Sequence, residues 1–565
     1  MLRWHHVSRR EAWLSAAAVF LVAALIRTWA AVEIVFPKPE DTAYYVGVAR
    51  NLVDGRGLVS DALWSFQTPP LTFPRPAFEV WLPLPTLVAA PFVALLAGPA
   101  PIPLEAAFRA SQVTSVLWGA LVCVLAWRLA ADVAAERGLP PGRARILALG
   151  AGLTCAAYMP LILHSALPDS TMPFAALALG ACLVATRVVL RPGQARLNDR
   201  RLWGLGVLLG LTALTRNEAV WLALTWVVLV VAIPSARLPA PATVARARLV
   251  GVAAAASLVV FAPWAARNFA EFGSPLPGQA VANAFSVTGF DIFAWNDPPT
   301  LSRYLAVGPA RLIEMRIEGI AHNLLNVLLY LGTPVSAIGL LALPWQARDP
   351  ALRPVVLLGL LTFAITSLAF PVATTWGTFL HAAGPVHVLL VIAALGAVDA
   401  LLARIGVVRG WTRPVAWLGA LLGIAASALF SVVLLPGFAG GSVATQRLYE
   451  VLAERMAAIG EPFDPAHPVI HDFPIWLAET ERIPTLALPA ESPEDVIDLA
   501  RAFPGTRMLI VGKADHEEWP AVLDTDAPGA DCFVELHLGT PPDPDDAAAI
   551  EGMRVFRLAC LEVGP

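Results

Sequence analysis

Long runs of apolar residues, separated by short polar turns, dominate the chain from residue 12 to residue 435. A helix of about 20 residues, rising 1.5 Å per residue, crosses the roughly 30 Å hydrocarbon core of a bilayer. The runs therefore predict about eleven membrane-spanning helices. Their expected ranges are 12–31, 109–130, 146–163, 173–190, 202–215, 218–234, 249–266, 322–342, 354–371, 384–403 and 414–435.

Residues 437–565 follow a different pattern, because the long apolar runs stop there. PVIHD, TLALP, RMLIVG and CFVELHLG are typical of short strands, whereas PIWLAETE and SPEDVIDLARAF are typical of helices. Ser492 stands at the N-cap position of the second helix. We therefore expect a mainly helical polytopic membrane domain over residues 1–436 and a small soluble α/β domain over residues 437–565.

The stretch from Phe36 to Leu84 interrupts the apolar pattern with acids, tyrosines and a proline-rich return. A loop this long is usually either functional or disordered, and its aromatic residues argue against disorder. We interpret it as the active-site loop of a membrane enzyme. The following apolar segment, 82–97, opens with proline and contains more. Because the arginine-rich loops would otherwise fall on the wrong side of the membrane, we expect a juxtamembrane helix rather than a span.

Composition supports a membrane protein and arginine sets its orientation. The chain is 57% hydrophobic and 15% charged, whereas soluble domains carry about 25% charged residues. If segment 82–97 does not span, every short arginine-rich loop falls on one side, which the positive-inside rule makes cytoplasmic. We therefore expect a multi-pass protein of the cell (inner) membrane, with a cytoplasmic N-terminus and an extracytoplasmic C-terminal domain. Outside the membrane, Cys532 and Cys560 could pair or stay free.

The candidate catalytic acids are Glu40 and Asp41, which follow the first predicted span. Tyr44 and Tyr45 come three and four residues after Asp41, so a helix would place these three side chains near one face. An ionised aspartate can take the proton of a hydroxyl as that hydroxyl attacks an electrophile. The alternative interpretation is that both acids only favour the positive end of a helix.

Four arginines lie on the expected extracytoplasmic side, against the general bias of arginine in this chain. They are Arg75, Arg109, Arg216 and Arg267. A guanidinium group binds phosphate through two parallel hydrogen bonds, so these residues indicate a phosphate-bearing substrate. For each one the alternative is an interaction with lipid headgroups, and Arg216 could also be neutralised by Glu218.

Further polar residues are expected on the same side. Asp169 lies in the turn LPDST, where turn capping explains it as well as function does, and His164 and His381 supply imidazoles. No pair of histidines and acids has the spacing of metal ligands, so the sequence predicts no metal site. Asp169 could still orient an acceptor, or bind a divalent cation if the reaction uses one.

These motifs together resemble the polytopic glycosyltransferases of the GT-C fold, especially the protein O-mannosyltransferase and aminoarabinose-transferase (ArnT-like) branch. The family's first extracytoplasmic loop has an acid, a tyrosine three or four residues later, then A-x-N-L and G-x-G. The matching residues here are Asp41, Tyr44 or Tyr45, Ala49–Leu52 and Gly55–Gly57. The family's Asp-Glu pair is not intact, because Thr42 follows Asp41 and the glutamate precedes it.

Later segments resemble further family elements in the same order, so that the resemblance covers about residues 12–280. They are FPRPAFEVWLPL, AFRASQVTS, LPDST, TRNEA and PWAARNFAEFGSPLP. The resemblance implies a polyprenyl-phosphate sugar as donor, with Asp41 and Glu40 as catalytic carboxylates. It implies Arg109 as a donor-phosphate contact, and we expect Arg75, Arg216 or Arg267 to bind the phosphate together with it. It also makes Tyr44, Tyr45, Glu79, Asp169 and His381 substrate-binding candidates.

The expected reaction is the transfer of a sugar to an acceptor hydroxyl on a glycan, lipid or protein, with no nucleic-acid partner. Phosphate is a good leaving group, so one base and a cationic group suffice for a single inverting displacement. The main alternative is a transporter or flippase of lipid-linked glycans. The predicted spans favour the enzyme, because they contain almost no acids, Asp399 being an exception. A non-enzymatic scaffold for the tail would not require the long first loop.

Overall fold

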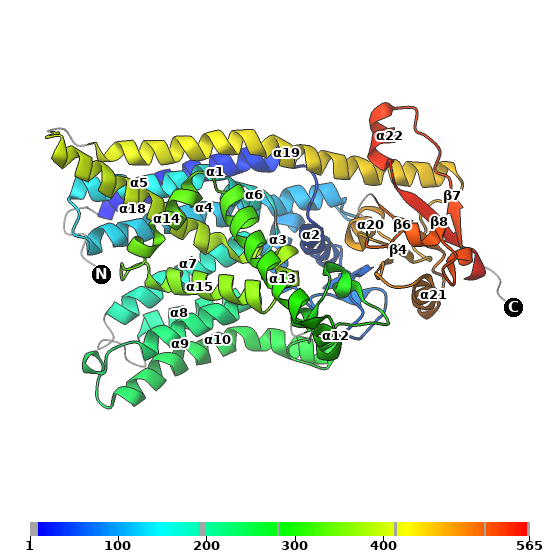
Figure 1. Cartoon of the computed structure of the whole chain (residues 1–565), viewed down its shortest axis with the longest axis horizontal. Helices are drawn as coiled ribbons and strands as arrows, with labels where there is room; N and C mark the ends of the chain where they lie inside the picture. The colour runs from blue at the N-terminus through cyan, green and yellow to red at the C-terminus, as the bar shows by residue number, and fades with distance from the viewer. Residues whose placement is uncertain (1–8, 191–198, 279–281, 412–414, 513–515, 562–565) are drawn as a thin grey trace.

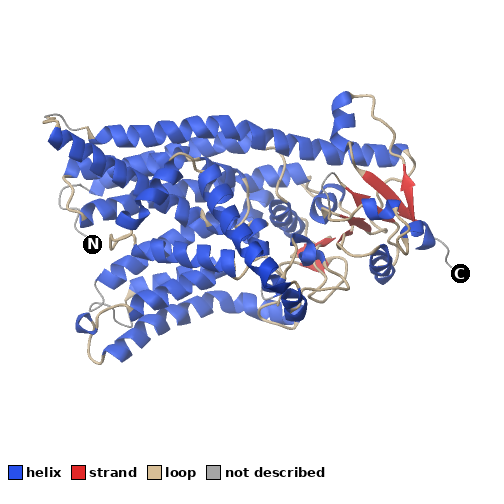
Figure 2. Ribbon diagram, viewed as in Figure 1, coloured by secondary structure: helices blue, strands red, loops and turns tan. Residues whose placement is uncertain are grey.

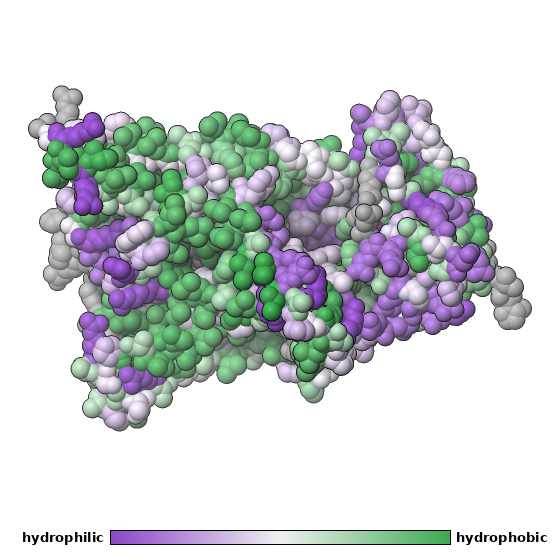
Figure 3. Space-filling model, in the orientation of Figure 1, coloured by the Kyte–Doolittle hydropathy of each residue, from purple (hydrophilic) through white to green (hydrophobic). Residues whose placement is uncertain are grey.

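The computed structural model describes residues 9–190, 199–278, 282–411, 415–512 and 516–561. Figure 1 shows an elongated helical bundle with the C-terminal segment at the end remote from the N-terminus. Strands gather only at that end of the drawn chain, as Figure 2 shows. In Figure 3, apolar residues cover most of the bundle's surface on this face, whereas polar residues cover the C-terminal part. The protein is thus mainly helical, with an apolar body.

Six helices of the described chain are long and apolar enough to cross a membrane. They are α1 (Arg9–Glu33), α4 (Leu104–Glu136), α7 (Thr171–Leu190), α10 (Ala242–Phe272), α18 (Gly384–Val408) and α19 (Ala416–Ala458). Two bent pairs raise this number to as many as eight. These are α5 (Pro141–Ala157) with α6 (Met159–Ala166), bent by 53°, and Gly308–Tyr330 with α14 (Val335–Gln346), bent by 115°. The 308–330 stretch comprises α13 (Gly308–Ala321) and a π-helix (His322–Tyr330).

The remaining predicted spans coincide with shorter helices: α8 (Arg200–Ala213), α9 (Ala219–Val231) and α15 (Arg353–Leu368). By length alone they do not qualify as full spans, so the count of eleven stays a prediction. The segment expected to be juxtamembrane forms α3 (Leu84–Leu96), which has only 13 residues. Its helix therefore reaches roughly 20 Å, short of the hydrocarbon thickness.

A buried arginine stabilises the break between α5 and α6. The end of α5 leaves backbone carbonyls without helical donors, and Arg27 of α1 donates to the carbonyl oxygens of Cys155 and Ala156, each at 3.2 Å. Its Nε also donates to Ser165 Oγ at 3.0 Å. Gly119 makes room for this network, because a Cβ there would lie 1.9 Å from Ser165 Oγ. This arginine therefore supports α6, although it is not among the residues predicted from the sequence.

The first long loop contains α2 (Glu40–Val53) and three two-residue strands, β1 (Val59–Ser60), β2 (Ala62–Leu63) and β3 (Arg75–Pro76). Strands β1 and β3 pair with each other, but β2 joins a six-stranded sheet with the C-terminal strands. Those strands are β4 (Val469–His471), β5 (Thr485–Ala487), β6 (Met508–Val511), β7 (Phe533–Leu536) and β8 (Arg554–Leu558). The sheet order is β2-β5-β4-β6-β8-β7. Strands β2, β5, β4 and β6 run parallel, and β8 runs antiparallel to both of its neighbours, β6 and β7.

The predicted strand segments form β4, β5, β6 and β7, and the predicted helices form α20 (Pro474–Glu481) and α21 (Pro493–Ala502). Ser492 caps α21 as expected, accepting a hydrogen bond from the amide of Asp495. The division into domains at residue 436 stays a prediction, because α19 runs through that position without interruption. Cys532 and Cys560 form a disulfide.

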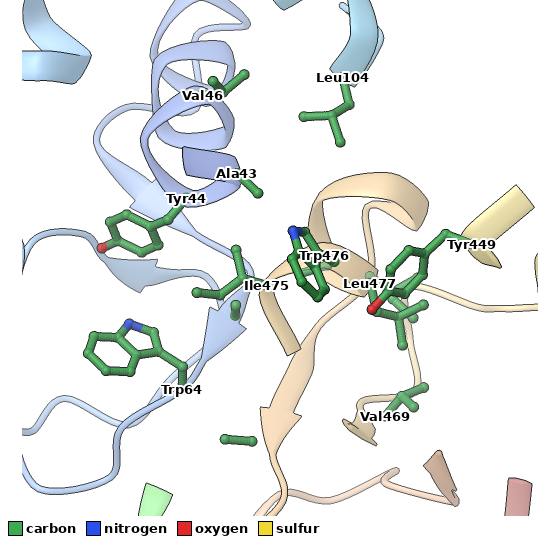
Figure 4. Packing of buried hydrophobic residues seen from close by; sticks show 14 of the residues in the cluster. Ala43, Tyr44, Val46, Trp64, Leu104, Tyr449, Val469, Ile475, Trp476 and Leu477 are labelled. Atoms are coloured by element: carbon green, nitrogen blue, oxygen red, sulfur yellow. The ribbon is translucent and has the colours of Figure 1, made fainter. Parts of the chain in front are cut away.

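The first loop and the C-terminal segment share one hydrophobic core. Trp64 and Tyr44 come from the loop, and Ile475 and Val469 from the tail, and all four are buried in the same cluster. Figure 4 shows Ile475 lying between α2 and the strands of the tail. The loop is thus held from two sides, by the helical bundle and by the tail.

An ion pair between α2 and the tail helix α20 lies within this core. Arg50 Nη2 is 2.7 Å from Glu479 Oε2, and the two side chains are 2% and 1% exposed. Gly47 permits the approach, because a Cβ there would lie 2.0 Å from the Glu479 carboxyl carbon. Burial raises the pKa of Glu479 to about 7 even though Arg50 opposes the shift. The ionised form of Glu479 therefore depends on Arg50 for its stability.

We predict that R50M destabilises the protein by about 3–5 kcal/mol, because it leaves the Glu479 charge buried without its partner. The double variant R50M/E479M should recover most of this loss, since it removes both charges. Melting temperatures of the purified variants in detergent measure the effect. An R50M protein that melts with the wild type would contradict the prediction.

Candidate active site at the base of the first loop

Asp41 lies in the first turn of α2, where the helix N-terminus favours a negative charge. Its Oδ1 accepts a hydrogen bond from the amide of Thr42 at 2.9 Å. Its Oδ2 lies 3.2 Å from Nε2 of His381. The Asp41 side chain keeps 13% of its surface exposed, so it is accessible yet largely removed from water. The residue that the sequence predicted as the base therefore stands at a partly open position.

His381 connects Asp41 to the second predicted carboxylate. It lies on α17 (Thr378–Ala382), which follows Gly377 in a left-handed conformation with φ 113°. Its Nδ1 shares a hydrogen bond with Thr171 Oγ1 at 2.7 Å and lies 3.6 Å from Asp169 Oδ2. Asp169 also caps its own turn, since its Oδ1 accepts from the Thr171 amide at 2.7 Å. The turn-capping interpretation of Asp169 is therefore confirmed, whereas its role in a site stays a prediction.

A third imidazole completes the cluster. His164, on α6, lies beside His381 with ring centroids 5.8 Å apart. Both of its ring nitrogens, and Asp169 Oδ2, have no hydrogen-bond partner among the described residues. The ligand atoms of His164, Asp169 and His381 lie within 4.8 Å of one another, and all three residues are buried. Imidazole nitrogen and carboxylate oxygen are ligands that divalent transition metals accept, so this group could hold a cation.

Burial controls the protonation of these groups. It raises the pKa of Asp41 to about 6, although the nearby Arg216 lowers it. It raises the pKa of Asp169 to about 8, further increased by the Asp41 charge. Burial, with a contribution from Arg216, lowers the pKa of His381 to about 3, so this imidazole is neutral. Of the two carboxyls, Asp41 therefore has the lower pKa and ionises more readily.

Arg216 is the predicted arginine whose charge acts on both carboxyls. It follows α8 and donates to Ser170 Oγ at 2.8 Å. It also binds both oxygens of Glu218, at 3.1 and 2.8 Å, as the sequence analysis allowed. Tyr45 belongs to the same surroundings, because Arg216 and Asp41 both influence its pKa, which burial raises.

The other three predicted arginines bind backbone carbonyls. Arg75 is buried in the first loop and donates to the carbonyls of Ser65 and Thr68, each at 2.6 Å. Its Nη1 is also 3.1 Å from Glu79 Oε1. Arg109 donates to backbone carbonyls at the end of α1, including that of Ala31 at 2.7 Å. These guanidinium groups hold irregular backbone in place, and their donor-phosphate role stays a prediction.

Arg267 and Tyr44 lie against the same loop. Arg267 donates to the Ala77 carbonyl at 2.7 Å and stacks over Trp264, 4.9 Å from its ring centroid. The Tyr44 hydroxyl accepts from the Phe78 amide at 2.7 Å. Tyr44 is therefore engaged with the loop backbone, whereas the adjacent Tyr45 lies in the surroundings of Asp41.

Glu40 makes a different contact from Asp41. Its Oε1 accepts a hydrogen bond from the amide of Ile475, the second residue of α20, at 2.9 Å. Burial raises the pKa of Glu40 to about 8. The two adjacent acids thus serve two partners, since Asp41 meets His381 and Glu40 meets the tail.

Comparisons with known proteins place the fold. No protein-family model and no curated protein matches the chain. Among solved structures, the chain is similar to ArnT from Cupriavidus metallidurans bound to undecaprenyl phosphate, at 14% identity and a TM-score of 0.54, covering 98% of this chain and 99% of that one. It is also similar to the oligosaccharyltransferase of Archaeoglobus fulgidus in complex with Zn and sulfate, at 15% identity and a TM-score of 0.54, covering 92% and 71%.

A further structure of the archaeal oligosaccharyltransferase AglB, in complex with an inhibitory peptide and a dolichol-phosphate, matches at 13% identity and a TM-score of 0.52, covering 92% of this chain and 72% of that one. The similarity to ArnT runs over nearly the whole length of both chains. It includes the C-terminal segment as well as the helical bundle. The resemblance that the motifs indicated is therefore confirmed: this protein has the GT-C fold of polytopic membrane glycosyltransferases.

Proposed function

We propose that this protein is an integral-membrane glycosyltransferase that moves a sugar from a polyprenyl-phosphate-linked donor to an acceptor hydroxyl, with inversion, on the extracytoplasmic side. The observation that carries the proposal is the partly exposed Asp41 carboxylate, held by His381 and close enough to Arg216 for their charges to interact. Solved proteins of this fold bind undecaprenyl phosphate or a dolichol-phosphate. A base beside a guanidinium suits a donor of this class.

In the proposed mechanism Asp41 accepts the proton of the acceptor hydroxyl as its oxygen attacks the anomeric carbon. The bond from that carbon to the phosphate oxygen breaks, and the polyprenyl phosphate leaves with the bonding electrons. Phosphate leaves without protonation, so no general acid is required. Arg216 stabilises the negative charge that develops on the phosphate oxygen. One displacement inverts the anomeric carbon.

The group His164, Asp169 and His381 fits a divalent cation, because the unpartnered nitrogens of His164 are buried beside an unpartnered carboxylate oxygen. Such an ion would stabilise charge on the donor phosphate as a Lewis acid. The similar archaeal oligosaccharyltransferase was solved with Zn. Asp169 and His381 would then orient the ion, and His381 would also keep Asp41 in place.

Transport is the less supported function. Asp399, the acid noted within a predicted span, forms an ion pair with Arg143 at 2.7 Å. This ion pair explains why an acid lies within a predicted span, so Asp399 needs no role in a substrate path. In the cluster around His381, by contrast, both ring nitrogens of His164 and Asp169 Oδ2 have no hydrogen-bond partner among the described residues.

We predict that D41N lowers sugar transfer by about 10²–10⁴-fold, because the amide cannot accept the acceptor proton. Transfer of radiolabelled sugar from a panel of polyprenyl-phosphate sugars measures the rate. E136Q is the matched control, since Glu136 is an exposed carboxylate at the end of α4 away from the site. Near-normal turnover by a folded D41N protein would remove Asp41 as the base.

We predict that R216M/E218Q lowers kcat by about 10²–10³-fold, because the phosphate loses its charge stabilisation. The double change avoids leaving the Glu218 charge alone, and R409M serves as a control at an exposed arginine. The same assay, with kcat and KM for the donor measured separately, checks the result. Unchanged constants would assign the phosphate contact to another arginine.

We predict that Zn²⁺ binds to the metal-free protein and that H164A and H381A each weaken binding by at least about tenfold. Calorimetric titration with Zn²⁺ alone measures this without any turnover. H537A is the control, because His537 is exposed in the tail. Equal affinity in all four proteins would show that the ion binds elsewhere.

A further inference from the structure

Helix α20 of the tail lies along the back of α2, the helix that carries Asp41. Trp476 Nε1 donates to the Pro37 carbonyl at 2.9 Å, just before α2 begins. At the other end, Arg482 Nη2 is 2.9 Å from Asp54 Oδ2, just after α2 ends. The buried Arg50–Glu479 pair lies between these two contacts. The tail therefore contacts α2 along its whole length.

Glu40 supplies the N-terminal cap that α20 lacks. The first amides of a helix have no partner within the helix, and a side chain at the N-cap usually accepts from one of them. The N-cap residue of α20 is Phe473, which cannot do so, and no side chain caps the helix from that position. The Glu40 carboxylate accepts from the Ile475 amide instead. The cap of α20 thus comes from α2.

The two adjacent carboxylates fix the first turn of α2 in rotation. Successive side chains of a helix point about 100° apart, so anchoring one of them constrains the direction of the next. Glu40 is anchored to α20, and Asp41 meets His381 on another side. Loss of the Glu40 contact would free the first turn to rotate or fray, because Pro39 before it provides no cap.

We propose that Glu40 is a positioning residue, which caps α20 and thereby couples the seating of the tail to the orientation of the Asp41 carboxylate. The proposal rests on the proposed role of Asp41 as base. It gives the tail a task in the reaction: the tail supports the catalytic helix from behind and need not touch the substrate. It also explains why the acid before Asp41 is half-buried and hydrogen-bonded to an amide of the tail.

The chain offers a matched control contact. Glu491 of the tail accepts hydrogen bonds from the backbone amides of Trp295, Asn296 and Asp297, at 2.8 to 3.1 Å. This contact joins the tail to the membrane part by the same chemistry, a carboxylate binding backbone amides. It does not involve α2. E491A therefore removes a docking contact without touching the helix that carries Asp41.

The test compares E40A, E40Q, E40D and E491A in the full-length protein. E40A and E40D should lower kcat roughly ten- to hundredfold with little change in the donor KM, because the base is misplaced and donor binding is not. E40Q should restore most of the activity, since its amide oxygen still reaches the Ile475 amide. E491A should keep the wild-type kcat. Low activity of E40Q equal to that of E40A would overturn the proposal.

A second measurement does not depend on turnover. Hydrogen exchange of the α2 amides 42–46 and of the α20 amides 475–477 should quicken in E40A and E40D, and stay as in the wild type in E40Q and E491A. Wild-type exchange in E40A, or faster exchange with an unchanged kcat, would overturn the positioning role. If D41N turns over normally while E40A still loosens α2, the proposed base is wrong but the coupling between tail and helix stands.

Discussion

The contact between Asp41 and His381 is the constraint on which the site depends. It joins the first loop to the short helix before α18, and through Asp169 it reaches the turn before α7. Buried polar groups are costly unless they bind one another. These side chains satisfy most of their hydrogen-bonding groups with one another, but the two ring nitrogens of His164 have no partner among the described residues. Unpartnered imidazole nitrogens at a buried position make the cluster a candidate for binding a ligand.

Several arginines of this molecule bind the backbone carbonyls of irregular segments near the site. Arg27 holds the carbonyls at the break between α5 and α6, and Arg75 and Arg267 hold those of the first loop. A guanidinium group has five donors in a rigid plane, so a single side chain can satisfy several carbonyls that lack helical partners. Regular helices need no such help, which is why these arginines gather where helices end.

The C-terminal segment packs together with the first loop and α2 as one folded unit. Strand β2 of the first loop lies at the edge of the sheet, paired with β5. Helix α20 packs on α2 through a buried ion pair and the Glu40 cap. A sheet that borrows a strand from the loop fixes the loop in register, because each ladder hydrogen bond specifies a partner. Figure 4 shows the shared core that results.

The sequence alone determined the features that depend on local pattern. Apolar length predicted the long spans, alternation predicted four of the tail strands, and spacing placed Asp41 and the tyrosines on one helix. The ordered motifs also indicated the GT-C fold, because such motifs mark the loops between spans. The spacing to the tyrosines favoured Asp41 over Glu40 as the base, but the different partners of the two acids could not be predicted, since both acids stand in the same helical turn.

Only the tertiary structure decided which residues meet. It brought His164, Asp169 and His381 together from three elements, put the charge of Arg216 within reach of Asp41, and directed Glu40 to the tail. It also placed β2 in the sheet and paired Cys532 with Cys560. The physical reason is that hydropathy specifies which face of a helix is buried, whereas the rotation and packing of neighbouring helices specify what that face touches.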